Sequence, residues 1–243
     1  MKILGMDSSG LVAGVAVTED NVLLAEYTTD YKKTHSQTLL PMLDELCRMI
    51  ELDVSTIDAI AISAGPGSFT GLRIGSATAK GLGLALKKPL IEVPTLEGLA
   101  WNLWGSEGLV CPIMDARRNQ VYCGAYEFVP AGESFQMQTV LGQDALDIRA
   151  LIQKLNETGR PVIFLGDGVP VYLKEIRELM QVPFRIAPAG NNRQRAASVA
   201  ALGAVYYAKG RFVDAASHQP EYLRKSQAER EQEEKRCAAE SDQ

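Results

Sequence analysis

Short apolar runs alternate with helical patterns along most of the chain, and this alternation predicts an α/β fold. The chain opens with three apolar runs, Lys2 to Asp7, Leu11 to Thr18 and Val22 to Tyr27. The segments between them, Ser8-Ser9-Gly10 and Glu19-Asp20-Asn21, consist of residues that favour turns. The pattern therefore predicts a three-stranded meander with Asp7 at its first bend.

Two helical patterns follow, and the second is rich in small residues. The first runs from His35 to Ile50, and the second runs from Thr70 to Lys87 after a buried strand from Ile57 to Ala64. A glycine inside a helix costs about 1 kcal/mol relative to alanine. The second helix nevertheless contains Gly75, Gly81 and Gly83. We expect a low surface on which another backbone packs; a tight turn followed by a helix on its own sheet is the competing interpretation.

The second half of the chain repeats the opening pattern. Leu109 to Asp115 is an apolar strand that ends in aspartate, and Gln120 to Phe128 is its return strand. The remaining predicted elements are strands Leu90–Val93 and Val162–Leu165 and helices Leu96–Trp104, Ala145–Leu155, Val171–Met180 and Ala196–Lys209.

Such a duplication predicts the actin-like (ASKHA, ribonuclease H-like) fold, in which two lobes enclose a cleft. We assign residues 1–106 to the first lobe and residues 107–225 to the second, with the option that the last segment returns to the first lobe. Residues 226–243 are mostly charged or small and are predicted to form a disordered tail.

The net charge, the apolar runs and the cysteines limit which classes of function the chain can have. A formal net charge of −5 over 243 residues argues against binding nucleic acid through the overall field of the protein. The chain shows neither an apolar signal segment nor an apolar run long enough to span a bilayer, so we expect a cytoplasmic protein without a membrane partner. The cysteines are scattered and are predicted to be reduced thiols: Cys47, Cys111, Cys123 and Cys237.

The first bend carries the strongest candidate chemistry. Asp7, Ser8 and Ser9 match the way actin-like ATPases and sugar kinases hold metal and phosphate, although these residues are equally common in plain turns. At the matching bend of the second copy the chain has Arg117 and Arg118, where a phosphate-gripping turn needs glycine and a small hydroxyl. We therefore interpret the first turn as vestigial, and keep an ATP-dependent phosphotransferase that uses Asp7 as an alternative.

A peptidase-like protein is a second alternative, suggested only by Ser68 and Ser9. A serine hydrolase needs a histidine beside its nucleophile, and the chain has only His35 and His218. Neither histidine has a sequence context that suggests catalysis, and no G-x-S-x-G elbow or metal-binding H-x-x-x-H pair occurs.

Several motifs together resemble the bacterial TsaB family, also called YeaZ: ILGMDSS, HSQTLLPMLDEL, SAGPGSFTGLRIG, VPTLEGLA and PEYLR. The resemblance runs from residue 1 to about residue 225. It implies a non-catalytic subunit that binds and activates the related TsaD, which transfers a threonylcarbamoyl group to adenosine 37 of tRNAs reading codons that begin with A. TsaE joins the complex as an ATPase, TsaC-type enzymes supply the donor, and tRNA is contacted through the complex. ATP and metal then belong to the partner complex, and the isolated chain needs no cofactor.

The resemblance also implies a site. In the family, the helices matching His35–Ile50 and Thr70–Lys87 pack against the same pair on TsaD, and the same face forms a homodimer when TsaD is absent. The implied partner-binding residues are His35, Leu39, Met42, Leu43, Leu46, Phe69, Arg73, Ala77, Lys80, Gly81 and Leu84. The metal-binding histidine pair of TsaD corresponds to Thr95 and Leu99 here, and its third ligand falls in Arg193-Gln194-Arg195. None of these residues can take the place of the TsaD ligands.

Overall fold

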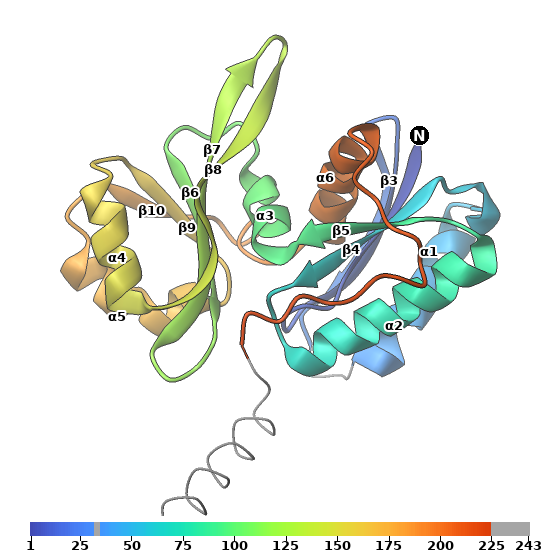
Figure 1. The fold of residues 1–243 in the computed structure, drawn as a ribbon, viewed down its shortest axis with the longest axis horizontal. Helices are drawn as coiled ribbons and strands as arrows, with labels where there is room; N and C mark the ends of the chain where they lie inside the picture. Colours follow the sequence, from blue (N-terminus) through green and yellow to red (C-terminus); the bar gives the residue numbers. More distant parts are fainter. Residues whose placement is uncertain (32–34, 225–243) are drawn as a thin grey trace, which may run out of the picture.

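The computed structural model describes residues 1–31 and 35–224, which form two lobes side by side (Figure 1). Each lobe is built on a five-stranded mixed sheet. The order in the first sheet is β3-β2-β1-β4-β5, and the order in the second, read in the same direction, is β8-β7-β6-β9-β10. The two sheets therefore share one topology, which confirms the predicted duplicated, actin-like fold. The tail predicted for residues 226–243 lies outside the described residues.

The first lobe consists of a meander, two parallel strands and three covering helices. Its strands are β1 (Lys2–Asp7), β2 (Ala13–Glu19), β3 (Val22–Thr29), β4 (Ala59–Gly65) and β5 (Leu90–Pro94). Its helices are α1 (His35–Met49), α2 (Phe69–Leu86) and α6 (Ala196–Ala208), with a short 3-10 turn η1 (Val54–Thr56) before β4. Strand alternation decides which layer each side chain joins: Leu4 and Met6 of β1 pack with α1, whereas Ile3 packs with α6.

The second lobe repeats this plan with a longer hairpin. Its strands are β6 (Leu109–Asp115), β7 (Gln120–Ala131), β8 (Ser134–Asp147), β9 (Val162–Leu165) and β10 (Phe184–Ile186). Helices α4 (Ile148–Glu157) and α5 (Gly168–Leu179) cover one face of the sheet. The other face packs on α3 (Thr95–Ala100) and its 3-10 extension η2 (Trp101–Leu103), which connect the two lobes.

Two strands were missed by the sequence pattern. β8 is half-exposed along most of its length, and the outer end of the β7–β8 hairpin projects from the lobe (Figure 1), so its residues carry no clear apolar alternation. β10 is only three residues long. The predicted helix start at Ala145 is also wrong, because Ala145 pairs with Tyr122 inside the hairpin and Asp147 caps α4 by accepting from the Arg149 amide.

The chain returns to the first lobe after β10. Helix α6 packs on β1, β2, β4 and β5, and its apolar residues surround the whole helix because it lies between the first sheet and α3. Beyond α6, Val213 forms a bridge with Leu90 at the edge strand β5. The segment that follows runs along α2 toward the space between the lobes (Figure 1).

The three cysteines within the described residues are free thiols, as predicted: Cys47, Cys111 and Cys123. Burial raises the pKa of Cys123 to about 12, so this thiol stays protonated at neutral pH. Cys237 lies outside the described residues.

Candidate functional site: the outer face of α1 and α2 and the adjoining cleft

The glycines of α2 divide into two groups. A Cβ atom at Gly71 would lie 2.0 Å from the Ser8 carbonyl oxygen, and one at Gly75 would lie 2.3 Å from the Ser8 hydroxyl oxygen. At Gly83 a Cβ atom would lie 2.7 Å from the Cβ of Ala215. These positions serve close packing inside the lobe, so the interpretation of Gly75 and Gly83 as part of an outward surface is wrong.

Gly81 belongs to the other group, because no atom lies within 4 Å of the position its Cβ would take. Ala77 and Arg73 lie on the same exposed side of α2, and Leu84 is 58% exposed. On the neighbouring α1, Leu40 is 51% exposed. We call these five residues the outer face. The Phe69 and Lys80 side chains lie at its border and are half-buried.

The α1 part of the predicted site needs correction. The side chains of Leu39, Met42, Leu43 and Leu46 are buried in the core of their own lobe. These four residues form the apolar stripe that covers the sheet, whereas Leu40 is exposed outside that stripe and was not among the residues implied by the resemblance. His35 also turns inward, and its Nε2 lies 2.8 Å from the Gly10 carbonyl oxygen.

The Asp7 turn is buried and hydrogen-bonded to the start of α2. The Oδ1 atom of Asp7 accepts hydrogen bonds from the Ser9 amide (2.8 Å) and hydroxyl (2.7 Å), and Oδ2 accepts one from the Ser63 hydroxyl (2.5 Å). Ser8 donates to the Gly71 carbonyl, and Ser9 accepts at its carbonyl from the Ser68 amide. Burial raises the pKa of Asp7, while its bonds to Ser63 and Ser9 oppose that shift. The polar groups of this turn therefore form their hydrogen bonds with other residues of the first lobe.

The matching turn of the second lobe remains open. Asp115 Oδ1 accepts from the Arg117 amide (2.8 Å) and the Tyr172 hydroxyl (3.0 Å). Arg117, Arg118 and Asn119 are exposed and have left-handed backbones with φ of 62°, 56° and 59°. Both arginines are exposed, and Arg117 lines the cleft described next.

A cleft of about 500 Å³ lies between the two turns and the start of α2. The segment 221–224 crosses it. The Glu221 amide donates to the Ala64 carbonyl (2.7 Å), and the Tyr222 ring lies 4.7 Å from the Phe69 ring. The Arg224 guanidinium donates to the Ala116 carbonyl of the second lobe (2.6 Å). The chain itself therefore contributes part of the lining of its own cleft.

The positions that match the TsaD histidines do not fit a metal. Thr95 is fully buried and accepts at its hydroxyl from the Gly65 amide (3.1 Å), and Leu99 is a core residue. Gln143 of the second lobe accepts from the Leu96 amide (3.0 Å) at the same place. Among the described residues, no group of three His, Cys, Asp or Glu side chains could hold a metal ion.

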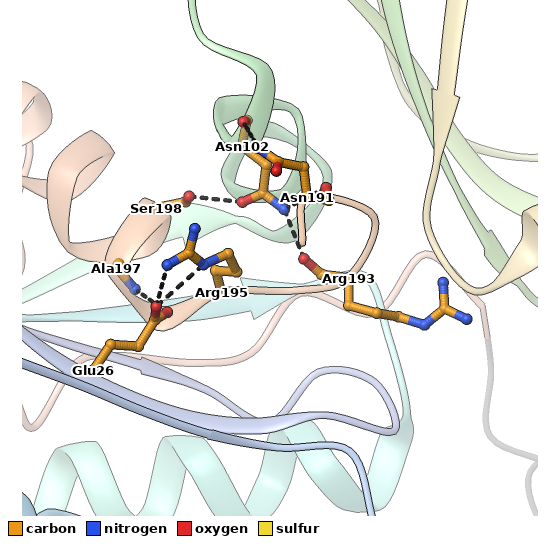
Figure 2. A network of polar contacts seen from close by, with 7 residues as sticks. All are labelled: Glu26, Asn102, Asn191, Arg193, Arg195, Ala197 and Ser198. Atoms are coloured by element: carbon orange, nitrogen blue, oxygen red, sulfur yellow. Dashed lines mark hydrogen bonds and ion pairs between the residues drawn. The ribbon is translucent and has the colours of Figure 1, made fainter. Parts of the chain in front are cut away.

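The predicted third-ligand segment is structural (Figure 2). Arg195 pairs with Glu26, with Nε lying 3.1 Å from Oε2, and the other carboxylate oxygen of Glu26 accepts from the Ala197 amide at the start of α6. Arg193 donates to the Gly166 carbonyl of the second lobe (3.2 Å). In the Asn102 side chain, the amide nitrogen donates to the Arg193 carbonyl. Arg195 thus fastens the start of α6 to the first lobe, whereas Arg193 contacts the second lobe.

The sequence also missed the surroundings of His218. Its Nε2 lies 2.9 Å from the Ser76 hydroxyl oxygen, and its Nδ1 lies 2.7 Å from Glu92 Oε1. This order of groups matches a serine hydrolase, but Ser76 is 5% exposed in the interior of α2. The arrangement therefore joins the C-terminal segment to α2. Of the serines considered for catalysis, Ser9 is buried on Asp7 and Ser68 caps α2.

Comparisons with known proteins agree on one family. A model of the TsaD family, described as tRNA N6-adenosine threonylcarbamoyltransferase, matches residues 22–232. The tRNA threonylcarbamoyladenosine biosynthesis protein TsaB of Bacillus subtilis is 33% identical over 94% of this chain and 96% of its own length. TsaB of Escherichia coli is 35% identical over 52% of this chain and 55% of its own length. The solved structure of YeaZ from Pseudomonas aeruginosa superposes with a TM-score of 0.74 at 27% identity, covering 91% of this chain and 99% of that one.

Among the described helices, none is long and apolar enough to span a membrane.

Proposed function

Because this chain belongs to the TsaB family of tRNA threonylcarbamoyladenosine biosynthesis proteins, we propose that it is a non-catalytic subunit that binds and activates TsaD. TsaD then transfers the threonylcarbamoyl group to adenosine 37 of tRNAs reading codons that begin with A. The ATP and the metal belong to TsaD and TsaE, and tRNA is contacted through the complex in the cytoplasm.

The outer face carries this proposal. Gly81 and Ala77 present almost no side chain, so a helix of another protein can approach the α2 backbone closely. Leu84 of the same helix and Leu40 of the neighbouring α1 are exposed apolar residues. Since the same face can pair with a second copy of itself, we propose that the chain forms a homodimer when TsaD is absent.

The cleft supports a non-catalytic role. A phosphotransferase would need Asp7 available for metal and phosphate, but this carboxylate is buried and bonded to Ser9 and Ser63. Thr95 and Leu99 offer no metal ligands at the positions of the TsaD histidines. The residues of this chain therefore act by holding the partner rather than by chemistry on the tRNA.

Reconstituted transfer with TsaD, TsaE, a TsaC-type enzyme and tRNA tests the proposal. We expect transfer only when this chain is present, and we expect Gly81→Arg to abolish both TsaD association and transfer. The space around Gly81 is open, so the variant should fold normally, as circular dichroism would confirm. Gly142→Arg is the matched control, because Gly142 lies in equally open space on β8 of the other lobe.

Co-purification of Gly81→Arg with TsaD at wild-type yield would show that the interface lies elsewhere. Transfer at full rate without this chain would refute the activating role. In the absence of TsaD, the same variant should elute as a monomer in size-exclusion chromatography, while Gly142→Arg remains dimeric.

A further inference from the structure

Residues 214–224, which we call the strap, connect three parts of the molecule. The strap follows α2 from its C-terminal end toward its N-terminal end and then enters the space between the lobes (Figure 1). It begins at Ala215, which is buried against Gly83 of α2. It ends at Arg224, which donates to the Ala116 carbonyl of the second lobe.

His218 fastens the middle of the strap to the first lobe. Its side chain is 1% exposed, and its two ring nitrogens contact Ser76 of α2 and Glu92 of β5. Lys80 adds a third contact by donating from Nζ to the His218 carbonyl (3.0 Å). Release of His218 is costly because it breaks the bond between the buried imidazole and the buried Ser76 hydroxyl, whereas the Glu92 side chain is 37% exposed. His218 is therefore a buried attachment of the strap.

The strap closes on the cleft immediately after this attachment. The Glu221 amide donates to the Ala64 carbonyl at the end of β4, and the Glu221 carbonyl oxygen would lie 2.1 Å from a Cβ atom at Gly65. Only glycine permits this approach, and Gly65 also has a φ of +127°. The backbone at the end of β4 is thus shaped to receive the strap.

The strap also engages residues at the border of the outer face. The Tyr222 ring packs on Phe69, and the Arg73 guanidinium lies 4.0 Å from the centre of the Phe69 ring on α2. With the contacts of Lys80 and Ser76 to His218, three side chains of α2 contact the strap. The side chains of Glu221 and Tyr222 are exposed, so this half of the strap is held mainly by local contacts.

We propose that the strap is an internal ligand of the cleft: it holds the two lobes together, and its release at His218 opens the cleft and frees the N-terminal half of α2. This inference goes beyond partner binding. It concerns the chain alone, so it can fail without affecting the proposed function.

Amide hydrogen exchange of the full chain, measured residue by residue by NMR without TsaD, tests the proposal. Glu221 reports on the strap through its bond to Ala64. Leu96 reports on the lobes, because its amide donates to Gln143 of the second lobe. His218→Ala should accelerate exchange at both amides by about tenfold or more, as expected when a local closed state loses buried bonds.

Tyr222→Ala provides a second route, because its side chain is exposed and its removal should leave the fold intact. It should accelerate exchange at Glu221 and Leu96 in the same direction. Gln219→Ala is the control, since this neighbouring side chain is exposed, and it should change neither rate. Unchanged exchange at Glu221 in both variants would refute the attachment, and faster exchange at Glu221 with an unchanged rate at Leu96 would refute the role in holding the lobes.

Discussion

The two lobes use the same turn in opposite ways. Each first strand ends in an aspartate whose Oδ1 accepts from the amide two residues later, at 2.8 Å for Asp7 with Ser9 and 2.8 Å for Asp115 with Arg117. In the first lobe this turn is buried beneath α2. In the second lobe it is exposed and ends in two arginines. One local structure has therefore become a packing element in one copy and a surface loop in the other.

The difference arises from the helix that follows each parallel strand. Gly71 lets the first turn of α2 settle on Ser8, where any side chain would collide with the Ser8 backbone. In the second lobe, α5 starts at Gly168, where a Cβ atom would lie 3.1 Å from the Ile113 carbonyl oxygen. The polar groups of the first turn bond within their own lobe, whereas the second turn carries Arg117 and Arg118 in place of a glycine and a small hydroxyl.

The largest expected effect comes from placing a side chain between the first turn and α2. Gly71→Ala should lower the free energy of unfolding by about 3 kcal/mol, because its Cβ atom would require backbone movement at Ser8. Gly168→Ala, the counterpart in the second lobe, should cost about 1 kcal/mol or less. Urea unfolding of both variants measures the difference. Equal losses would show that the two turns are packed equally tightly.

The next largest difference in stability is expected between one ion pair of the first lobe and one of the second lobe. Glu26 is 11% exposed at its side chain, pairs with Arg195 and caps α6, so Glu26→Gln should cost about 2 kcal/mol. Glu127 pairs with Arg160 in the second lobe but is 24% exposed and caps no helix there, so Glu127→Gln should cost less than about 1 kcal/mol. Thermal unfolding at low and high salt separates the two, since the more exposed pair should be more sensitive to salt. A larger loss for Glu127→Gln would contradict this ranking.

A smaller effect, of opposite sign, is expected on the outer face. Gly81→Ala should raise the free energy of unfolding by about 1 kcal/mol, because alanine favours helix and the added methyl group meets no atom. Gly71→Ala offers the same helix gain but collides with Ser8, so the two variants isolate packing from propensity. Urea unfolding at protein concentrations low enough to dissociate the proposed homodimer measures both. A loss of stability in Gly81→Ala would mean that this face is already covered within the chain.

The smallest effect should appear as a pH dependence of the first turn. Burial raises the pKa of Asp7 above its ordinary value, so the folded chain binds this proton more readily than the unfolded chain. The contribution of Asp7 to stability is therefore greatest below its ordinary pKa and declines as pH rises through the folded pKa. Asp7→Asn cannot ionise, so its stability relative to the wild type should increase as pH rises above the ordinary aspartate pKa of about 3.9.

Ser63→Ala should shift the same pH profile in the opposite direction. The Ser63 hydroxyl is the hydrogen bond that most strongly opposes the raised pKa of Asp7, so its removal should raise that pKa further. Stability relative to the wild type should then fall as pH rises. Chemical unfolding at several pH values measures both profiles, and parallel profiles for the two variants would contradict the assignment to Asp7.

Local residue patterns were enough to predict the elements and their duplication. Apolar runs, turn residues and helical spacing are local properties, so they located β1, α1, α2 and the two aspartate turns. The correspondence of Thr95 and Leu99 to the TsaD histidines came from the family resemblance. The motifs also sufficed to identify the family. These features depend only on residues that are neighbours along the chain.

Which surface each residue occupies depends on tertiary packing. The family resemblance implied Leu39 as a partner-binding residue, but its side chain lies in the core of its own lobe. Identical glycines of α2 proved to be buried at Gly75 and open at Gly81. The contact of His218 with Ser76 joins residues 142 positions apart. Contacts between segments distant in sequence follow from how the layers pack, and local residue patterns do not record that packing.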